Sequence, residues 1–205
     1  MSPAHAAASS DRLSPGFADP VHDAQQAFRA ALAALSRPGR PVETGPAIDG
    51  LGLGAAMAHL LLALSDDDCA VWWQDSDASA ARWLRFHTGA TVAVTLGNAM
   101  FAVVTDALAM PGLAEFAQGS AAAPEFSSTL LIEVPSLVDG PSLQWRGPGI
   151  KDAAEVRIAG LPPSFWSHWQ ANHAGFPQGV DVIFTCGSQA LGLPRTTRVS
   201  RLEEV

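Results

Sequence analysis

Apolar residues recur at helical spacing along several segments of this chain, and the clearest of these segments comes first. Between Ala24 and Leu35 the apolar side chains follow the 3.6-residue period, and Asp19-Pro20 supplies an N-cap and a proline at the first helical position. The helix is expected to end at Ser36-Arg37-Pro38-Gly39, because proline cannot continue it. The predicted helices cover residues 20–36, 55–64, 76–89 and 162–175, with a short one after Pro111.

Shorter runs rich in β-branched and aromatic residues lie between the predicted helices and indicate strands. Several neighbouring strands are separated only by turn residues, as at Gly97-Asn98. This favours a mixed sheet with helices on both faces over a uniformly parallel one, so the predicted fold class is α/β. The predicted strands cover residues 69–74, 91–96, 99–105, 128–134, 143–147, 154–161 and 180–185, and one or two more follow before the C-terminus.

With 205 residues, the chain is long enough for one sizeable domain with a core of its own. Residues 1–15 are rich in Ala, Ser and Pro without any period, so we expect a disordered tail there and a single α/β domain over residues 16–205. The longest apolar stretch, residues 55–64, is about half the roughly 20 residues that span a bilayer, and no signal-peptide pattern is visible. We therefore expect a cytoplasmic protein that does not enter a membrane.

The net charge of −8 argues against a general nucleic-acid binder, which would present a basic face. A local anion site is still compatible with it, since the chain has eleven arginines and one lysine. That lysine, Lys151, follows the turn Gly147-Pro148-Gly149 and is the only candidate for a Schiff base with pyridoxal phosphate. The pattern shows neither a phosphate cup nor an acidic partner for the cofactor ring, so no cofactor is predicted.

Two further patterns suggest binding chemistry but lack the spacing or context that it needs. Gly50, Gly52 and Gly54 precede a helix, where a glycine-rich turn can hold phosphate, but residues 41–49 do not form the buried strand that should come first. The six histidines and the two cysteines, Cys69 and Cys186, form no cluster with the spacing of metal ligands. No nucleotide site and no metal site are predicted.

The stretch FPQGVDVIFTCGSQALGLPRTTRV, residues 176–199, contains an apolar strand that ends in Cys186-Gly187. Cys186 is a candidate nucleophile, but such a cysteine needs a base, and none is near it in the sequence, although His87 or His173 could approach it in space. The alternative is that its thiol closes a buried strand as a small apolar group. Sequence reasoning leaves both interpretations open.

The same stretch then reaches a polar turn that carries Arg195, Thr196, Thr197 and Arg198. Unpaired charge is costly to bury, so arginines beside a proline turn are expected at the surface. There they can meet a carboxylate or a phosphate through two parallel hydrogen bonds. These four residues are the predicted contact with a partner subunit or an anionic ligand, and no catalytic residue is predicted.

Five segments together resemble the PhnH family, the H subunit of the bacterial carbon–phosphorus lyase core complex. They are GFADPVHDAQQAFRAALAALSRPG, RFHTGA, GSAAAPEFSSTLLIEV, GPGI and the stretch 176–199, and the resemblance extends from residue 16 to about residue 200. The pattern FPxGxDxxxTCG followed by PRTT is long and specific.

The resemblance implies a three-layer α/β/α fold like that of pyridoxal-phosphate-dependent transferases, without the cofactor. It also implies a homodimer in isolation and assembly with the other core subunits that break down phosphonates. With them the family supports the displacement of adenine from ATP by a phosphonate, which gives a ribose phosphonate triphosphate. The radical cleavage that follows belongs to another subunit, and this chain lacks the cysteine cluster for it. The alternative is an autonomous enzyme that uses Cys186 or handles phosphate.

Overall fold

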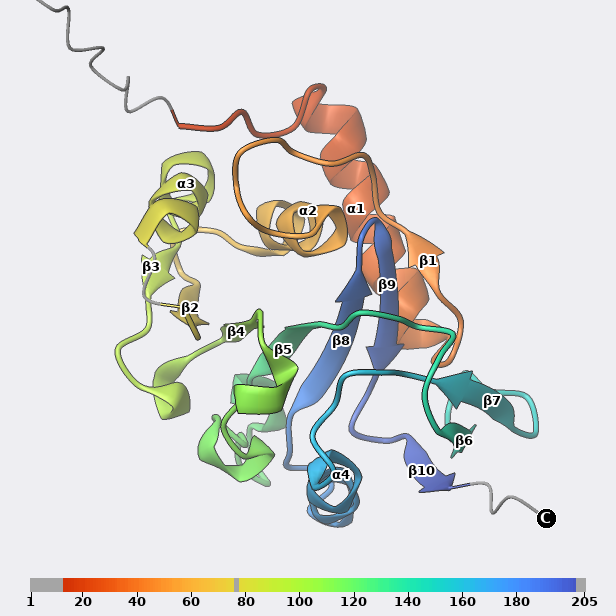
Figure 1. Cartoon of the computed structure of the whole chain (residues 1–205). Coiled ribbons are helices and arrows are strands. Elements are labelled where there is room, and N and C mark those ends of the chain that lie inside the picture. Colours follow the sequence, from red (N-terminus) through yellow and green to blue (C-terminus); the bar gives the residue numbers. More distant parts are fainter. Residues whose placement is uncertain (1–12, 76–77, 202–205) are drawn as a thin grey trace, which may run out of the picture.

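The computed structural model describes residues 13–75 and 78–201, and a seven-stranded mixed sheet runs through its centre (Figure 1). Its strands are β1 (Val42–Glu43), β2 (Ala70–Trp73), β3 (Thr91–Val92), β4 (Phe101–Val104), β5 (Thr129–Glu133), β8 (Asp181–Cys186) and β9 (Gln189–Leu193). They lie in the order β1-β9-β8-β5-β4-β2-β3, and within this sheet β9 alone runs against the other strands. The mixed sheet expected from the sequence is confirmed.

Helices cover one face of this sheet, and a layer of mixed composition covers the other (Figure 1). The first face carries α1 (Pro20–Ser36), α2 (Ala55–Leu64) and α3 (Ala78–Thr88). The second carries α4 (Phe165–Ala174) and an antiparallel sheet of β6 (Ser142–Arg146), β7 (Ala154–Arg157) and β10 (Arg198–Arg201), in the order β10-β6-β7. The expected outer layer of helices is therefore shared with a small sheet, because these three strands pair with one another and not with the main sheet.

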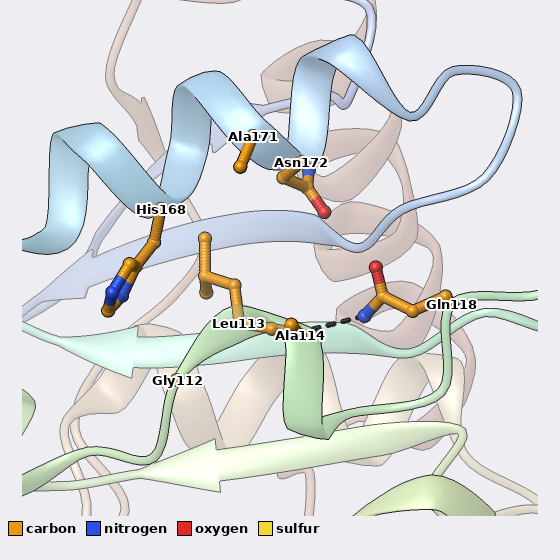
Figure 2. Close-up of a pocket in the computed structure, with 7 residues that line it drawn as sticks. All are labelled: Gly112, Leu113, Ala114, Gln118, His168, Ala171 and Asn172. Atoms are coloured by element: carbon orange, nitrogen blue, oxygen red, sulfur yellow. Dashed lines mark hydrogen bonds between the residues drawn. The ribbon is translucent and has the colours of Figure 1, made fainter.

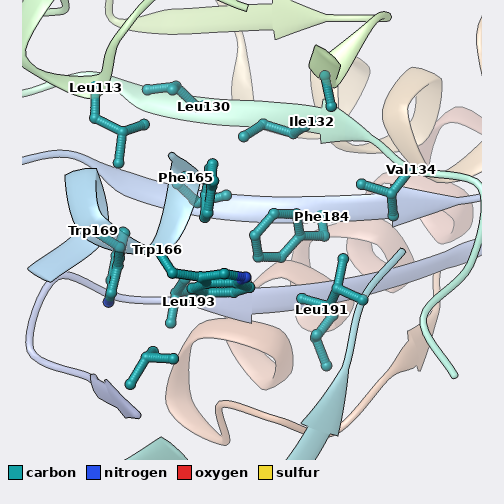
Figure 3. Close-up of a cluster of buried hydrophobic side chains, with 14 of the residues drawn as sticks. Leu113, Leu130, Ile132, Val134, Phe165, Trp166, Trp169, Phe184, Leu191 and Leu193 are labelled. Atoms are coloured by element: carbon teal, nitrogen blue, oxygen red, sulfur yellow. The ribbon is translucent and has the colours of Figure 1, made fainter. Parts of the chain in front are cut away.

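Alternate residues of the central strands contribute to two hydrophobic cores, one on each face of the sheet. Leu131 and Ile183 pack among the residues of α1, α2 and α3. Phe184 belongs to the second core, where Figure 3 shows it beside the aromatic side chains of α4. Its ring centroid lies 5.7 Å from that of Phe165 and 6.5 Å from that of Trp166. Offset aromatic contacts at these distances add to the stabilisation that comes from buried apolar area.

The first predicted helix is confirmed at both ends. The Asp19 side chain accepts hydrogen bonds from the backbone N–H groups of Val21 at 3.2 Å and His22 at 3.1 Å, so it caps α1 as expected. The helix ends at Ser36, before the proline. The predicted burial of α2 is also confirmed, since residues 55–61 are all buried.

The segment between α3 and β5 departs from the predicted strands. The strand expected over residues 91–96 ends at Val92, and the chain then forms the 3-10 helix η1 (Leu96–Asn98). β3 and β4 do not pair with each other, because each pairs in parallel with a different edge of β2. The further 3-10 helices are η2 (Ala107–Ala109), η3 (Leu113–Glu115) and η4 (Pro124–Phe126), and the short helix expected after Pro111 is η3.

Part of the predicted N-terminal tail packs against the folded domain. Residues 1–12 of the predicted tail and the serine cap expected at Ser76 lie outside the described residues. Ser14 and Pro15 do contact α3, since the Pro15 carbonyl accepts a hydrogen bond from Trp83 Nε1 at 3.0 Å and the Ser14 carbonyl lies 3.2 Å from His87 Nε2. Within residues 13–75 and 78–201, no helix has both the length and the apolar character needed to cross a bilayer.

Candidate functional site

The polar turn after β9 is built around Arg195, whose side chain is 13% exposed. Its Nε donates to both carboxylate oxygens of Asp181 at 3.2 Å, its Nη2 also contacts Oδ2, and its backbone N–H donates to Oδ1 at 2.7 Å. Asp181 is the first residue of β8, so this ion pair joins the open end of the hairpin formed by β8 and β9. The charge of Arg195 is therefore compensated within the chain.

The remaining donors of this guanidinium join the hairpin to two other segments. Its Nη1 donates to the carbonyl oxygens of Pro124 at 3.0 Å and Pro177 at 3.3 Å, and its Nη2 donates to the hydroxyl of Ser127. The end of η4 and the loop between α4 and β8 are thereby held at one point. We call Arg195, Asp181, Ser127 and these two carbonyl groups the Arg195 cluster, and its donor pattern is that of a structural crosslink.

The other three residues predicted as a contact take different positions. Thr196 is half-buried beside the cluster, and Thr197 is fully buried, with its carbonyl accepting a hydrogen bond from Trp169 Nε1 at 3.0 Å. Arg198 begins β10 and is exposed. The expectation that both arginines stand free at the surface does not hold for Arg195, because Asp181 lies opposite and pairs with it.

Arg198 lies directly opposite Arg146 of β6 in the antiparallel register, and both residues are exposed. Side chains that are directly opposite share one face of a sheet, so both arginines lie on the same exposed face of the small sheet, where Arg146 Nε also donates to Gln144 Oε1 at 3.0 Å. Like charges in this arrangement repel each other, and an anion bound between them removes that cost. Of the four residues in the predicted contact, Arg198 is therefore the one that can meet an external acidic group, together with Arg146.

Cys186 lies half-buried at the end of β8. Its Sγ donates to the backbone carbonyl of Pro135 at 3.5 Å, an acceptor that cannot remove the thiol proton. The two histidines that were candidate bases contact other elements: His173 Nδ1 lies 2.9 Å from the Arg195 carbonyl, and the His87 ring lies 5.5 Å from that of Trp83. The contacts at Cys186 therefore fit the closing of a strand better than nucleophilic catalysis.

The glycine-rich loop before α2 ends beside a carboxylate of the chain itself. Glu133, at the end of β5, accepts a hydrogen bond from the backbone of Gly54, and the Ala56 N–H donates to the Gly187 carbonyl at 2.8 Å. Two N–H groups at the start of α2 are thus taken by internal acceptors, and one of these acceptors is the carboxyl group of Glu133.

A pocket of about 190 Å³ lies between η3 and α4, and Figure 2 shows the residues that line it. Its lining residues are Gly112, Leu113, Ala114, Gln118, His168, Ala171 and Asn172. The side-chain amides of Gln118 and Asn172 extend toward each other across it, yet both are bonded to backbone. Gln118 Nε2 donates to the Leu113 carbonyl at 2.8 Å, and Asn172 exchanges hydrogen bonds of 2.9 and 2.8 Å with Val180. Apart from His168, whose exposed ring also lines it, the pocket therefore offers an apolar recess.

Two residues with important roles were missed at the sequence level, Asp181 and Glu133. The sequence did contain a signal for Asp181, because it is the acidic residue of GVDV at the start of a buried strand. The hairpin of β8 and β9 then brings the chain back to Arg195, beside Asp181. Glu133 ends a buried strand and gave no local signal of its contact with α2. In the described part of the chain, no three histidine, cysteine, aspartate or glutamate side chains are grouped in a way that could hold a metal ion.

Replacing Arg195 by glutamate should destabilise the fold, because two carboxylates would then face each other where an ion pair stood. We expect the free energy of unfolding to fall by about 3–5 kcal/mol in urea titrations. Arg198→Glu is the matched control, and because Arg198 is exposed its effect should stay within about 0.5 kcal/mol. Equal losses in the two variants would contradict the structural role of Arg195.

The pKa of the Glu133 carboxyl is raised above its usual range, because burial disfavours the charged form more than the hydrogen bond from Gly54 favours it. A group whose pKa is raised on folding contributes stability that is complete below its unfolded pKa, about 4.3, and is lost as the pH rises through its folded pKa. Glu133→Gln cannot ionise and keeps an acceptor for Gly54. The stability of this variant relative to the wild type should therefore increase as the pH rises from about 4 to 7. Urea unfolding across that range measures it, and parallel pH profiles would refute it.

The comparisons with known proteins agree on one family. The family described as bacterial phosphonate metabolism protein (PhnH) matches residues 15–200. The α-D-ribose 1-methylphosphonate 5-triphosphate synthase subunit PhnH of Rhizobium meliloti (strain 1021) is 40% identical over 198 residues, which cover 95% of this chain and 98% of that protein. HtxG of Stutzerimonas stutzeri, named as a candidate C–P lyase subunit, is 32% identical over 177 residues, which cover 86% of this chain and 85% of that protein. Because the matches extend over nearly the whole chain, it belongs to the PhnH family of bacterial phosphonate metabolism proteins.

Proposed function

We propose that this chain is a subunit of a cytoplasmic carbon–phosphorus lyase core complex. It supports the formation of α-D-ribose 1-methylphosphonate 5-triphosphate from ATP and an alkylphosphonate, and it contributes no catalytic residue of its own. The observation that carries this proposal is the 40% identity, over 95% of the chain, to a subunit of the synthase named for that product. The hydrogen bond from Cys186 to a carbonyl group and the internal pairing of Arg195 support a non-catalytic role.

We further propose that the fold is the one found in pyridoxal-phosphate-dependent transferases, used here without the cofactor. It is supported by the seven-stranded mixed sheet with a single reversed strand and by its two covering layers. Lys151 lies exposed in the loop between β6 and β7. An aldimine there would stand in water, which favours its hydrolysis.

Within the proposed complex, the pair formed by Arg146 and Arg198 is the contact for an acidic group of a partner or ligand. Two exposed guanidinium groups on one sheet face match the two oxygens of a carboxylate or a phosphate. Thr196 lies near this turn and can add a hydroxyl. Arg195 supports the contact indirectly, by holding the chain that leads into β10.

In isolation the chain is proposed to form a homodimer through α1. This helix exposes a second apolar face beside the alanines that it buries: Val21 is 69%, Phe28 47% and Leu32 53% exposed. The three lie seven and four residues apart, so they form one stripe along the helix. Two copies can cover this stripe by packing α1 against its counterpart across a two-fold axis.

Cells that need this chain to grow on methylphosphonate as sole phosphorus source should grow normally when it carries Cys186→Ser. A hydroxyl in place of the thiol costs on the order of 1–3 kcal/mol, and a domain with about 5–15 kcal/mol of stability survives that loss.

Arg198→Glu should slow growth and weaken co-purification of the other core subunits by about tenfold, because it places an acid opposite Arg146. Arg85→Glu, at an exposed arginine of α3, controls for the change in net charge.

Loss of growth in Cys186→Ser with an assembled complex would revive the nucleophile interpretation. Normal growth and assembly of Arg198→Glu would remove the role assigned to the arginine pair.

Sedimentation of the purified wild type should show a dimer at micromolar concentration. Phe28→Glu should shift the protein to monomer, because it places a charge in the middle of the apolar stripe. Phe86→Glu, at a phenylalanine of α3 that is 69% exposed, is the matched control and should leave the dimer intact. A monomeric wild type, or a dimeric Phe28→Glu variant, would count against this interface.

A further inference from the structure

Two hollows are lined by η3, η4, α4 and the loops that follow α4 and β9. The first is the pocket of Figure 2, with its apolar walls. The second is a groove of about 310 Å³ whose walls include Phe176 and three prolines, Pro124, Pro177 and Pro194. Neither hollow has a role in the function proposed above.

Hydrogen bonds within the chain join the segments that line the two hollows. Gln118, which lines the first, pairs with Ser127 in an antiparallel bridge, and Ser127 directly follows η4, which lines the second. Gln178 Nε2 donates to the Gly119 carbonyl at 3.2 Å, and the Gly179 N–H donates to the Gln118 carbonyl at 2.9 Å. The loop between α4 and β8 is thereby tied down between them. We call the two hollows and this loop the double-hollow surface.

Aromatic side chains stand exposed at this surface. Phe176, in the wall of the groove, is 58% exposed, and Phe126, at the end of η4, is 72% exposed. Large apolar side chains gathered beside a preformed recess are typical of a contact surface. The Arg195 cluster holds η4 and the loop together before any partner arrives, and such preorganisation reduces the entropy cost of binding.

The charge of this surface points to the chemistry of its partner. Its segments carry the carboxylates Glu115, Glu125 and Asp181 and one guanidinium, Arg195, which is paired with Asp181. Two exposed carboxylates are left over, and the chain as a whole carries a net charge of −8. A second copy would bring like charges together, whereas a partner segment with lysine or arginine would be attracted.

We propose that the double-hollow surface docks an extended segment of another subunit of the complex. That segment places one apolar side chain in each hollow and a lysine or arginine beside Glu125. An extended chain directs alternate side chains to one face, which lets a short segment enter both hollows across the loop that separates them. The identity of the partner as a subunit of the complex rests on the function proposed above.

Two variants test the docking surface in the complete chain, co-expressed with the other core subunits. Ala171→Arg fills the first hollow with a long basic side chain, and Phe176→Ser removes the aromatic wall of the second. Both positions are exposed, so the fold should persist, and circular dichroism checks this. Gln170→Arg on the same helix and Val138→Ser at another exposed apolar position are the controls.

We expect each variant to reduce co-purification of the other subunits at least tenfold, while both controls behave as the wild type. If the wild type assembles and the two variants assemble equally well, the docking proposal is wrong and the proposed function stands. If the wild type itself does not associate with the core subunits, the proposed function fails and the docking proposal fails with it.

Photo-cross-linking identifies the occupant directly. A benzophenone amino acid in place of Phe176 should capture a peptide of another core subunit that contains apolar residues and a lysine or arginine. Capture of a second copy of this chain, or no cross-link to another subunit in an assembled complex, would overturn the proposal.

Discussion

The burial of β4, β5 and β8 on both faces is the constraint from which the plan of this protein follows. Parallel strands in the middle of a sheet expose apolar side chains alternately to each side, so each face needs its own cover. Leu131 and Ile183 are covered by α1, α2 and α3, whereas Leu130 and Phe184 are covered by α4 and the small sheet. The second cover is rich in aromatic residues, and the ring centroid of Trp166 of α4 lies 6.5 Å from those of both Trp145 of β6 and Phe184 of β8.

The Arg195 cluster supplies a second, polar constraint at the amino end of β8. Its guanidinium joins the hairpin of β8 and β9, the end of η4 and the loop after α4, which are distant from one another along the chain. Such a group is most effective when every donor has an acceptor, because an unpaired charge in the same place would be costly. The cluster thereby holds the loops of the double-hollow surface and the start of β10 in fixed positions.

The surface of the molecule is divided in a way that suits a subunit with several neighbours. An exposed arginine pair lies on the small sheet, an acidic and apolar surface lies beside η4, and an apolar stripe runs along α1. Two positions that the sequence pattern marked as candidates for binding or catalysis make hydrogen bonds within the chain. Glu133 meets the start of α2, and Cys186 bonds to a carbonyl group.

Much of the fold could be predicted from local patterns in the sequence. The cap at Asp19, the apolar period of α1 and the β-branched run of β8 depend on neighbours within a few residues, so each could be recognised from the sequence. The family resemblance rested on the same kind of contiguous pattern, above all the stretch 176–199. These features determined the fold class, the main helices and the central strands.

The tertiary structure alone decided how these elements pair and what the polar residues of the C-terminal turn do. The partner of a strand depends on residues far along the chain, so nothing local indicated that β6 would pair with β10 or that β3 and β4 would lie on opposite edges of β2. By the same reasoning, Arg195 and Arg198 look equivalent in the sequence. They differ in the folded chain because only Arg195 comes within reach of Asp181, and an arginine with an acid opposite it can be buried at a lower cost than one without.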